Sequence, residues 1–244
     1  MQLYVRHRLD EPLEIPVNHN QILQAVIYAS LGGASYKHYM HDQGFSYKNR
    51  KFKLFTFGTL SGEHEYHDKK LTFTDTISFE IRSPDPFFIR SLKEGIENNG
   101  IRIGEHHFQN IEMITDDVTV ESEMILVDMV SPVTVYSSDP ETKYRYYYSP
   151  IDSEFEEQIV GNFYRKYYAC YGVNCEDEVR VIPYNVRKND RIVTNYKGQY
   201  ITAYKGQYVI AGHRKCLDFM YQTGLGAKNA QGFGMFDIIS EGGC

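Results

Sequence analysis

The amino-acid sequence predicts an α+β protein made of two tandem ferredoxin-like (βαββαβ) domains with antiparallel sheets. Of its 244 residues, 42% are hydrophobic and 14% aromatic, which excludes a disordered, collagen-like or coiled-coil chain. Segments with strand and helix periodicity follow one another as strand, helix, two or three strands, helix, strand. A similar order begins again after the polar stretch 115–123. The domains are therefore placed at residues 1–118 and 119–244.

In the first half, residues 2–9 alternate in side-chain character and predict a strand. The helix that follows has Pro16 and Asn18 as its stop and cap. Its apolar residues recur at the helical period: Ile22, Leu23, Val26, Ile27 and Leu31. The remaining predicted elements of this half are strands at 53–60, 71–73 and 76–82, a helix that starts at Pro84 and Asp85 and closes at Gly100, and a returning strand at 107–114.

In the second half, a long helix at 151–170 begins with acidic residues, which suit a helix N-terminus. The other predicted elements are strands at 124–129, 134–136, 179–184, 191–194, 199–202, 208–212 and 233–239, and a short helix at 213–221. The pentapeptide YKGQY occurs at 196–200 and again at 204–208. It predicts either two hairpin turns at Lys-Gly or an edge of lysines and tyrosines that faces a nucleic acid.

Charge is unevenly distributed along a chain whose net charge is −6. Residues 105–157 hold thirteen acidic side chains against two basic ones, whereas residues 187–228 hold eight basic side chains against two acidic ones. The first stretch repels phosphate, and the second can dock a polyanion. The candidate phosphate-binding residues of this stretch are Arg187, Lys188, Arg191, Lys197, Lys205 and Arg214.

No metal site and no cofactor are predicted. The four cysteines are too few for a disulfide scaffold, and Cys170 and Cys175 lack the spacing and the second pair that zinc sites show. His64 and His67 fall in a predicted turn and lack further ligands. The sequence has no apolar run of about 18 residues and a charged N-terminus, so we expect no membrane association and a cytoplasmic location.

The strongest local motif is a glycine-rich loop between the last helix and the last strand, with Gly224, Gly226, Gly232 and Gly234 placed symmetrically. Glycine lets backbone N–H groups approach a phosphate, so this loop can cradle a nucleic-acid backbone, with Lys228 adding charge and Asn229 lying at its centre. The alternative is a tight crossing from helix to strand. Neither the dinucleotide fingerprint nor the Walker pattern is present.

This loop and the first helix resemble the CRISPR-associated endoribonucleases that process precursor CRISPR RNA, the sixth Cas family of the repeat-associated (RAMP) superfamily. The loop matches the form Gly-apolar-Gly, five residues, Gly-apolar-Gly. The matching residues near the N-terminus are Pro16, Asn18, Leu23, Gln24, Ile27 and Tyr28. The resemblance implies tandem ferredoxin-like domains and a metal-independent cut in repeat RNA that leaves 2′,3′-cyclic phosphate and 5′-hydroxyl ends.

The resemblance also implies a general acid/base set that falls by position on Tyr28, His41 and Lys53. On a helical wheel, Tyr28 projects about 150° from the apolar stripe and is expected to face away from the core. The imidazole of His41, with an ordinary pKa of about 6.5, can give or take a proton near neutrality.

Alternatives remain open at two of these positions. His38 lies three residues before His41 and competes with it for the acid/base role. Lys53 is expected to open a strand and to stabilise charge at the scissile phosphate, and Lys48 and Lys51 compete with it.

Two other functions are consistent with the same residues. One is a non-catalytic RNA-binding RAMP subunit of a CRISPR effector complex, which the glycine-rich loop would serve equally. The other is a small-molecule-binding ferredoxin-like protein that acts through its tyrosines. CRISPR repeat RNA is the expected partner, and the resemblance adds other Cas proteins and a second copy of the chain as candidate partners.

Overall fold

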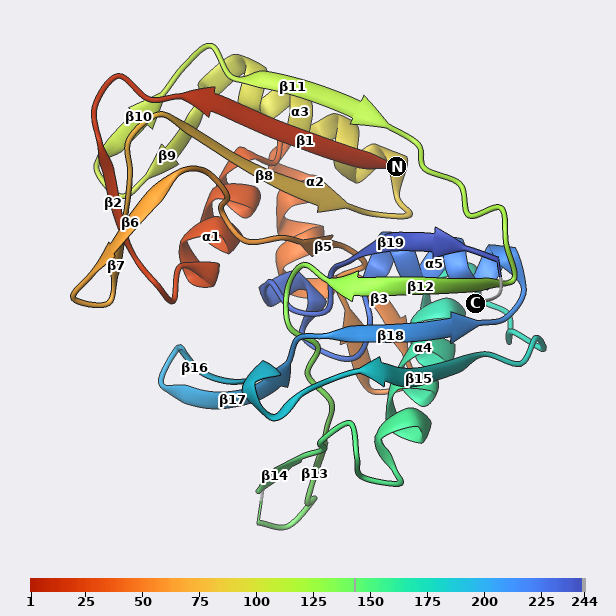
Figure 1. Cartoon of the computed structure of the whole chain (residues 1–244). Coiled ribbons are helices and arrows are strands. Elements are labelled where there is room, and N and C mark those ends of the chain that lie inside the picture. The colour runs from red at the N-terminus through yellow and green to blue at the C-terminus, as the bar shows by residue number, and fades with distance from the viewer. Residues whose placement is uncertain (143, 243–244) are drawn as a thin grey trace.

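The computed structural model describes residues 1–142 and 144–242, except for the side chains of residues 34, 35 and 41. Two four-stranded antiparallel sheets lie side by side, and each has its helices on the face turned away from the viewer in Figure 1. This arrangement confirms the predicted fold class of tandem ferredoxin-like domains. The chain leaves the first sheet at Asp116 and enters the second at Met124. We propose that the domain boundary lies between these two residues.

The first sheet has the strand order fourth, first, third, second of a βαββαβ unit. Its strands, in spatial order, are β11 (Glu112–Asp116), β1 (Gln2–Arg8), β8 (Thr76–Arg82) and β5 (Thr56–Phe57). Its helices are α1 (Asn20–Ser30) and α3 (Pro86–Asn99). Asp85 caps α3 as the sequence predicts, because its side chain accepts a hydrogen bond from the Phe87 N–H at 2.9 Å.

The second sheet repeats the same order. Its strands are β19 (Phe236–Glu241), β12 (Met124–Met129), β18 (Gln207–Ala211) and β15 (Arg180–Asn185), and its helices are α4 (Phe155–Tyr171) and α5 (Arg214–Thr223). Neighbouring strands are antiparallel throughout. The buried side chains of these strands, such as Ile125, Val127 and Ile210, belong to a core cluster that also contains residues of both helices.

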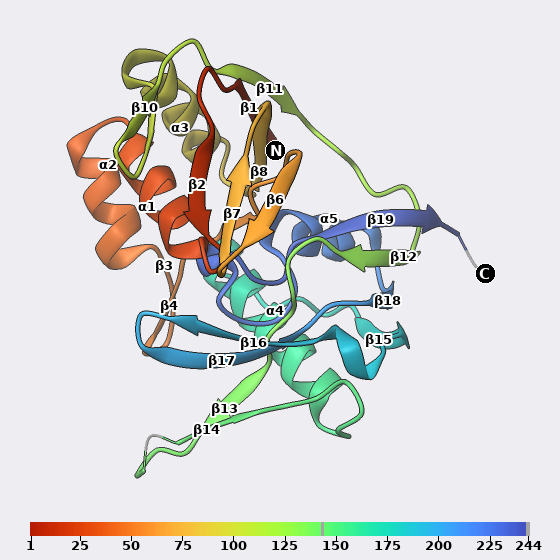
Figure 2. The same cartoon turned by 60° about the vertical axis from the view of Figure 1, so that its left-hand side comes forward.

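Smaller elements extend from the two sheets. A small three-stranded sheet contains β2 (Leu13–Pro16), β7 (Lys70–Phe73) and β6 (His64–His67). Four two-stranded hairpins are formed by β3 (Phe45–Tyr47) with β4 (Arg50–Phe52), β9 (Ile101–Ile103) with β10 (His106–Phe108), β13 (Tyr136–Ser138) with β14 (Arg145–Tyr147), and β16 (Arg191–Tyr196) with β17 (Gln199–Tyr204). The short helices are α2 (Ala34–His38), η1 (Tyr39–Gln43), η2 (Lys188–Asp190) and η3 (Asn229–Gln231). Figure 2 shows the hairpin of β13 and β14 projecting from the second domain.

Three local expectations are wrong. The N-cap of α1 is His19, which makes no side-chain capping bond, and the Asn18 side chain instead accepts a hydrogen bond from Thr194 Oγ1 at 2.8 Å. His64 and His67 lie on strand β6 and not in a turn. The expected strand at 53–60 is reduced to β5, because the chain passes between the two cores at this point.

The two YKGQY copies adopt different structures. In the first, Lys197 and Gly198 have positive φ angles and form the turn between β16 and β17, as the hairpin interpretation predicts. In the second, Lys205 and Gly206 connect β17 to β18, which belong to different sheets. The second copy is therefore a crossing between sheets and not a hairpin turn.

The two domains share a tight interface. Leu54 belongs to the core of the second domain, whereas the adjacent Phe55 belongs to the core of the first. Arg82 of β8 is 1% exposed, and its guanidinium reaches across to β19, where it donates to the Phe236 carbonyl at 2.5 Å and to Asp237 Oδ1 at 2.7 Å. The ring of Tyr221 on α5 lies 3.8 Å from the guanidinium carbon. The orientation of the domains is thus set by specific contacts.

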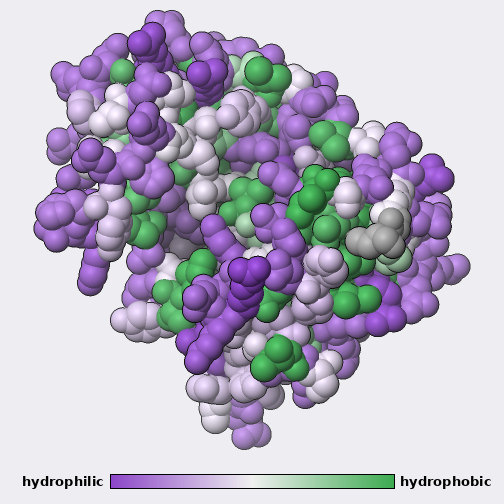
Figure 3. All heavy atoms as spheres, in the orientation of Figure 1, coloured by the Kyte–Doolittle hydropathy of each residue, from purple (hydrophilic) through white to green (hydrophobic). Residues whose placement is uncertain are grey.

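An apolar patch lies on the open face of the second sheet, visible on the right of Figure 3. Leu126, Ile182 and Val209 form one row across neighbouring strands on this face. Among the described residues, no helix has the length and apolar character needed to cross a bilayer.

Candidate nucleic-acid interface

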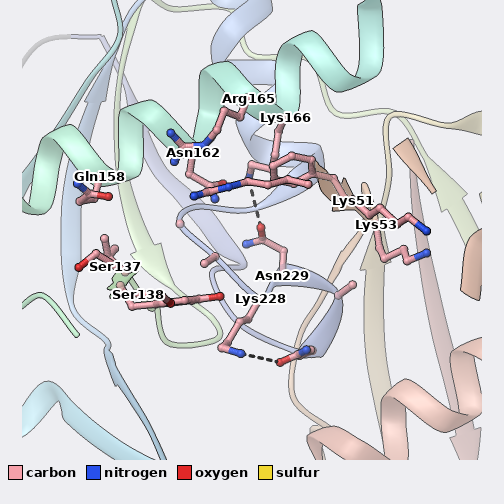
Figure 4. A pocket seen from close by; sticks show the side chains of 18 residues that line it. Lys51, Lys53, Ser137, Ser138, Gln158, Asn162, Arg165, Lys166, Lys228 and Asn229 are labelled. Atoms are coloured by element: carbon pink, nitrogen blue, oxygen red, sulfur yellow. Dashed lines mark hydrogen bonds between the residues drawn. The ribbon is translucent and has the colours of Figure 1, made fainter. Parts of the chain in front are cut away.

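A basic pocket of about 630 Å³ lies where the two domains meet the glycine-rich loop. Its walls come from the hairpin of β3 and β4, from β13, from one face of α4 and from residues 226–231 (Figure 4). None of the eighteen described residues that line it is acidic. The basic ones are Arg50, Lys51, Lys53, Arg165, Lys166 and Lys228. The pocket is therefore suited to an anion, although the chain as a whole is negatively charged.

Helix α4 supplies the largest polar wall of the pocket. Gln158, Asn162 and Arg165 are spaced four and three residues apart and line the same pocket. Two of their atoms, Asn162 Oδ1 and Arg165 Nε, are buried without a hydrogen-bond partner among the described residues. Burial and the nearby Arg50 lower the pKa of Arg165. These residues were not among the predicted site residues, although their spacing of four and three places them on one face of α4.

Lys166 and Asn229 connect the glycine-rich loop to helix α4. The ammonium group of Lys166 is buried and donates to the Gly224 carbonyl at 2.5 Å and to Asn229 Oδ1 at 3.2 Å. The Asn229 amide in turn donates to the carbonyls of Leu225 at 2.8 Å and Phe233 at 3.0 Å. Burial lowers the pKa of Lys166 to about 7. A helix of the second domain thus holds the loop through charged and polar hydrogen bonds.

Close packing explains the glycines of the loop. Gly234 has a φ of 79°, and a Cβ at this position would lie 2.0 Å from the Leu225 carbonyl oxygen. Gly232 has a φ of 81°, and a Cβ there would meet Asn20 and Phe57 of the first domain at 2.7 and 2.9 Å. The N–H groups of both glycines donate to backbone carbonyls, those of Pro132 and Asn229. The tight-crossing interpretation therefore accounts for these positions.

Helix α1 holds the other side of the loop. Asn20 Nδ2 donates to the Gly232 carbonyl at 3.0 Å, and Gln24 Nε2 donates to the Ala230 carbonyl at 2.5 Å. Tyr196 at the end of β16 donates its hydroxyl hydrogen bond to Gln24 Oε1. The two segments that carry the resemblance, α1 and the glycine-rich loop, are therefore in direct contact although they are about two hundred residues apart in the sequence.

Lys228 is the basic residue of the loop that lines the pocket. Its backbone has a φ of 63°, and its ammonium group lies 5.4 Å from the centre of the Tyr136 ring and donates to Gln231 Oε1 at 3.4 Å. Burial and the nearby Arg145 lower the pKa of Lys228 to about 8. A bound anion would favour the charged form of Lys228 and so oppose this shift.

Tyr28 of α1 is half-buried and packs against the first core, which differs from the expected outward orientation. Its ring meets that of Phe55 edge-on, with centroids 5.8 Å apart. Burial and the neighbouring Tyr196 raise its pKa above the ordinary value. The phenol therefore remains protonated at neutral pH.

The backbone of His41 lies in η1, and its side chain is outside the described residues. Its competitor His38 is exposed and pairs with Asp42, with 2.9 Å between Nδ1 and Oδ2. Lys51 Nζ donates to the Asp42 carbonyl at 3.0 Å. The η1 backbone that carries His41 is thereby tied to the hairpin of β3 and β4.

Lys53 follows β4 and is not part of a strand, so the expectation that it opens one is wrong. Its Nζ is buried without a hydrogen-bond partner among the described residues, and a Cβ on Gly44 would lie 3.2 Å from it. Burial, followed by the nearby Lys51, lowers the pKa of Lys53. Figure 4 shows Lys51 and Lys53 side by side at one edge of the pocket, with both ammonium groups pointing away from Asn229.

Most of the basic residues of 187–228 lie elsewhere. Among the eight basic residues of this stretch, Lys228 alone lines the pocket. Arg187, Lys188 and Arg191 lie at or next to η2, and Lys197 and Lys205 lie in the turns described above. Arg214 begins α5 beside a second hollow, which is lined by Glu123, Asp177, Glu178, Gly212 and His213. The hairpin of β3 and β4 brings Arg50 and Lys51 to the pocket in their place.

Two ferredoxin-like domains around a glycine-rich loop give the architecture that the resemblance to the RAMP superfamily implies. Residues 114–238 match the family model described as "CRISPR associated protein Cas6, C-terminal". This match covers more than half of the chain, and the protein therefore belongs to the Cas6 family.

Relatives match along almost the whole chain. The CRISPR-associated endoribonuclease Cas6 1 of Methanocaldococcus jannaschii is 25% identical over 254 aligned positions, which cover 99% of this chain and 94% of the relative. A solved structure titled as a Cas6-related gene from Pyrococcus furiosus has a TM-score of 0.81 at 21% identity and covers 99% of each chain. Another, titled "An RAMP protein binding different RNA substrates", has a TM-score of 0.81 at 20% identity and covers 98% of this chain and 100% of its own.

Proposed function

We propose that this protein is an endoribonuclease that cuts CRISPR repeat RNA and releases guide RNAs. The basic pocket is the observation that carries the proposal. Of the five buried polar side-chain atoms without a partner among the described residues, three belong to residues that line this pocket: Lys53 Nζ, Asn162 Oδ1 and Arg165 Nε. Buried polar atoms rarely stay unpaired, so they mark where a ligand completes the hydrogen bonding.

The ligand that fits these atoms is a phosphodiester with its ribose. Lys53 and Arg165 donate to phosphate oxygens, and Asn162 Oδ1 accepts from a hydroxyl or an exocyclic amine. The volume is within the range of ordinary ligand pockets and exceeds what a single phosphate needs. The name of the Methanocaldococcus relative, an endoribonuclease, supports the same substrate class.

Cleavage proceeds by attack of a ribose 2′-hydroxyl on the adjacent phosphorus. The new bond from O2′ to phosphorus forms as the bond from phosphorus to O5′ breaks, which leaves a 2′,3′-cyclic phosphate and a 5′-hydroxyl end. One group must accept the 2′-hydroxyl proton, and another must donate a proton to the departing 5′-oxygen. This displacement requires no metal ion.

We assign the proton-accepting role to His41 and the donating role to Tyr28. Because burial raises the pKa of Tyr28, its phenol is a poor base but carries a proton for the leaving oxygen. Imidazole is the side chain whose ordinary pKa allows it to accept a proton near neutrality. The Lys53 ammonium, which lies beside the end of η1, stabilises the charge that develops on the phosphate oxygens.

The test is incubation of the whole protein with labelled repeat RNA in excess chelator, next to a scrambled RNA of the same length. We expect one defined cut in the repeat RNA and none in the scrambled RNA. Product ends are read by phosphatase treatment, because a cyclic phosphate resists removal until it is opened by acid. Salt-sensitive binding without cleavage would instead establish the non-catalytic RNA-binding subunit.

RNA binding is expected to weaken as pH rises from 7 to 9. Lys228 binds phosphate only when protonated, and its pKa is about 8 in the free protein. Bound phosphate raises this pKa, so the contribution of Lys228 is complete below pH 8 and is lost above it. The dissociation constant should increase about tenfold over this interval for this single group.

The measurement is fluorescence anisotropy with a non-cleavable 2′-deoxy RNA at constant ionic strength. Lys228→Arg is the matched control, because guanidinium stays charged throughout this range. Its binding should change with pH by several-fold less than that of the wild type. Equal pH dependence in the two proteins would remove Lys228 from the interface.

A further inference from the structure

A group of three metal-ligating side chains lies outside the basic pocket, at the far end of α4. Cys175 and Asp177 are on the connection between α4 and β15, and Cys216 is in the first turn of α5. Their ligand atoms all lie within 4.8 Å of one another, and no other group of three or more His, Cys, Asp or Glu residues in the described part of the chain meets this criterion. In the sequence Cys175 is nearest to Cys170, whereas in the fold it lies beside Cys216.

The distances within this group match a tetrahedral zinc site. With Zn–S bonds of about 2.3 Å and Zn–O bonds of about 2.0 Å, two sulfurs are separated by about 3.8 Å, and a sulfur and an oxygen by about 3.5 Å. In the structure, the two sulfurs of Cys175 and Cys216 are 3.3 Å apart, and Cys216 Sγ lies 3.7 Å from Asp177 Oδ2. These two distances come within about half an ångström of the tetrahedral values, and the third pair, Cys175 Sγ with the Asp177 carboxylate, lies within 4.8 Å.

A disulfide between the same cysteines fits less well. Its sulfur–sulfur bond of about 2.05 Å requires the two sulfurs to approach by more than 1 Å. A disulfide also gives no reason for a carboxylate beside the thiol of Cys216. The Asp177 carboxylate thus favours a metal ion over a disulfide bond.

The surroundings add negative charge and rigidity. Asp177 belongs to the second hollow, of about 330 Å³, where Glu123, Glu178 and His213 also lie. Tyr164 of α4 donates its hydroxyl hydrogen bond to the Asp177 carbonyl at 2.9 Å, and Cys216 is 1% exposed. The backbone at Asp177 and the side chain of Cys216 are therefore held in place before a cation arrives, and the acidic residues of the hollow attract one.

We propose that Cys175, Asp177 and Cys216 bind one zinc ion, with a fourth ligand from the hollow, either water or a side chain that lines it. Each thiol releases its proton to solvent as its sulfur binds the metal. The ion joins the connection after α4 to the start of α5 and so stabilises the second domain. This site is independent of the proposed RNA cleavage, because its residues and those of the basic pocket are different.

The test uses the full chain, kept reduced with a phosphine. Titration with Co²⁺ should saturate at one ion per chain and produce the near-ultraviolet absorption of a cobalt–thiolate bond. Elemental analysis after dialysis against Zn²⁺ should give one zinc per chain. Cys175→Ser and Cys216→Ser should lose the absorption, whereas Cys170→Ser is the matched control that keeps it. Asp177→Asn should bind Co²⁺ at least tenfold more weakly.

Chelator should lower the melting temperature of the wild type and of Cys170→Ser but not that of Cys175→Ser. Cys216 is buried, so Cys216→Ser can fail to fold. The melting temperatures of Cys175→Ser and Cys170→Ser test the proposal without that variant. Less than a tenth of an equivalent of bound metal in the reduced wild type would overturn the proposal. So would undiminished Co²⁺ binding in Cys175→Ser.

Discussion

A single 2′-deoxyribose at the cleaved linkage of the repeat RNA is expected to abolish cleavage and leave binding intact. The substitution removes the nucleophile, and the pocket groups that contact phosphate are unaffected. Product should fall below detection on a denaturing gel, while the dissociation constant changes by less than about twofold. Cleavage of the deoxy RNA would show that water or another nucleophile attacks, and the proposed mechanism would be wrong.

We expect the three candidate catalytic side chains to contribute unequally to the rate of cleavage. His41→Ala should lower the single-turnover rate about 10²- to 10⁴-fold, which is the range for loss of a general acid or base. Tyr28→Phe should lower it less, because water can replace a proton donor at the leaving oxygen. Lys53→Met should lower the rate more than the affinity, since its ammonium stabilises charge that develops during the reaction.

Each variant has a matched control in the same segment. His38→Ala removes a histidine that is exposed and paired with Asp42, and Lys48→Met removes a lysine at the tip of the hairpin of β3 and β4. Both should cleave at nearly the wild-type rate. If His38→Ala is inactive and His41→Ala is active, the acid/base role belongs to His38.

Arg82→Met is expected to destabilise the protein by about 3 to 5 kcal/mol, the cost of breaking a buried charged contact from one side. The side chain is 1% exposed and donates to Glu80 at 2.5 Å as well as to two groups of β19 across the domain interface. Methionine fills the space but leaves the buried Phe236 carbonyl without its donor. The loss should appear as a lower free energy of unfolding in urea.

Arg180→Met is the matched control for this change. Arg180 also pairs with a carboxylate, that of Glu156 at 2.6 Å, but both side chains are partly exposed. Loss of such a pair should cost less than about 1 kcal/mol. If the two variants are equally stable, the contacts of Arg82 do not hold the domains together. Arg82→Lys keeps the positive charge but has fewer hydrogen-bond donors. Its free energy of unfolding should lie between those of the wild type and Arg82→Met.

The main elements could be predicted because their signals are local. Alternation in residues 76–82 and 124–129 predicted two strands whose bounds agree with β8 and β12. Asp85 and Gly100 marked the ends of α3 correctly, because capping depends on residues within one turn. The short strands β2 and β6 were missed, since each depends on pairing with β7, which is far along the chain from β2.

The candidate catalytic positions came from a family resemblance and not from any pattern in the residues. For Tyr28, the helical wheel indicated an outward position, but the ring packs against Phe55, which a later segment brings to α1. Lys166 was not predicted to be a site residue, and lysine is a residue type that is rarely buried. The Lys166 ammonium group is buried against Asn229 because the glycine-rich loop passes next to α4.

The sequence by itself determined the fold class, the order of the main strands and helices, and the presence of a glycine-rich loop before the last strand. Periodicity and backbone freedom are properties of neighbouring residues, so they can be recognised without a structure. Only the tertiary structure decided which cations meet in the basic pocket, that Arg82 joins the two domains, and that Cys175 lies beside Cys216. These pairs come from elements far apart in the sequence, and packing of the two domains and their helices alone brings them together.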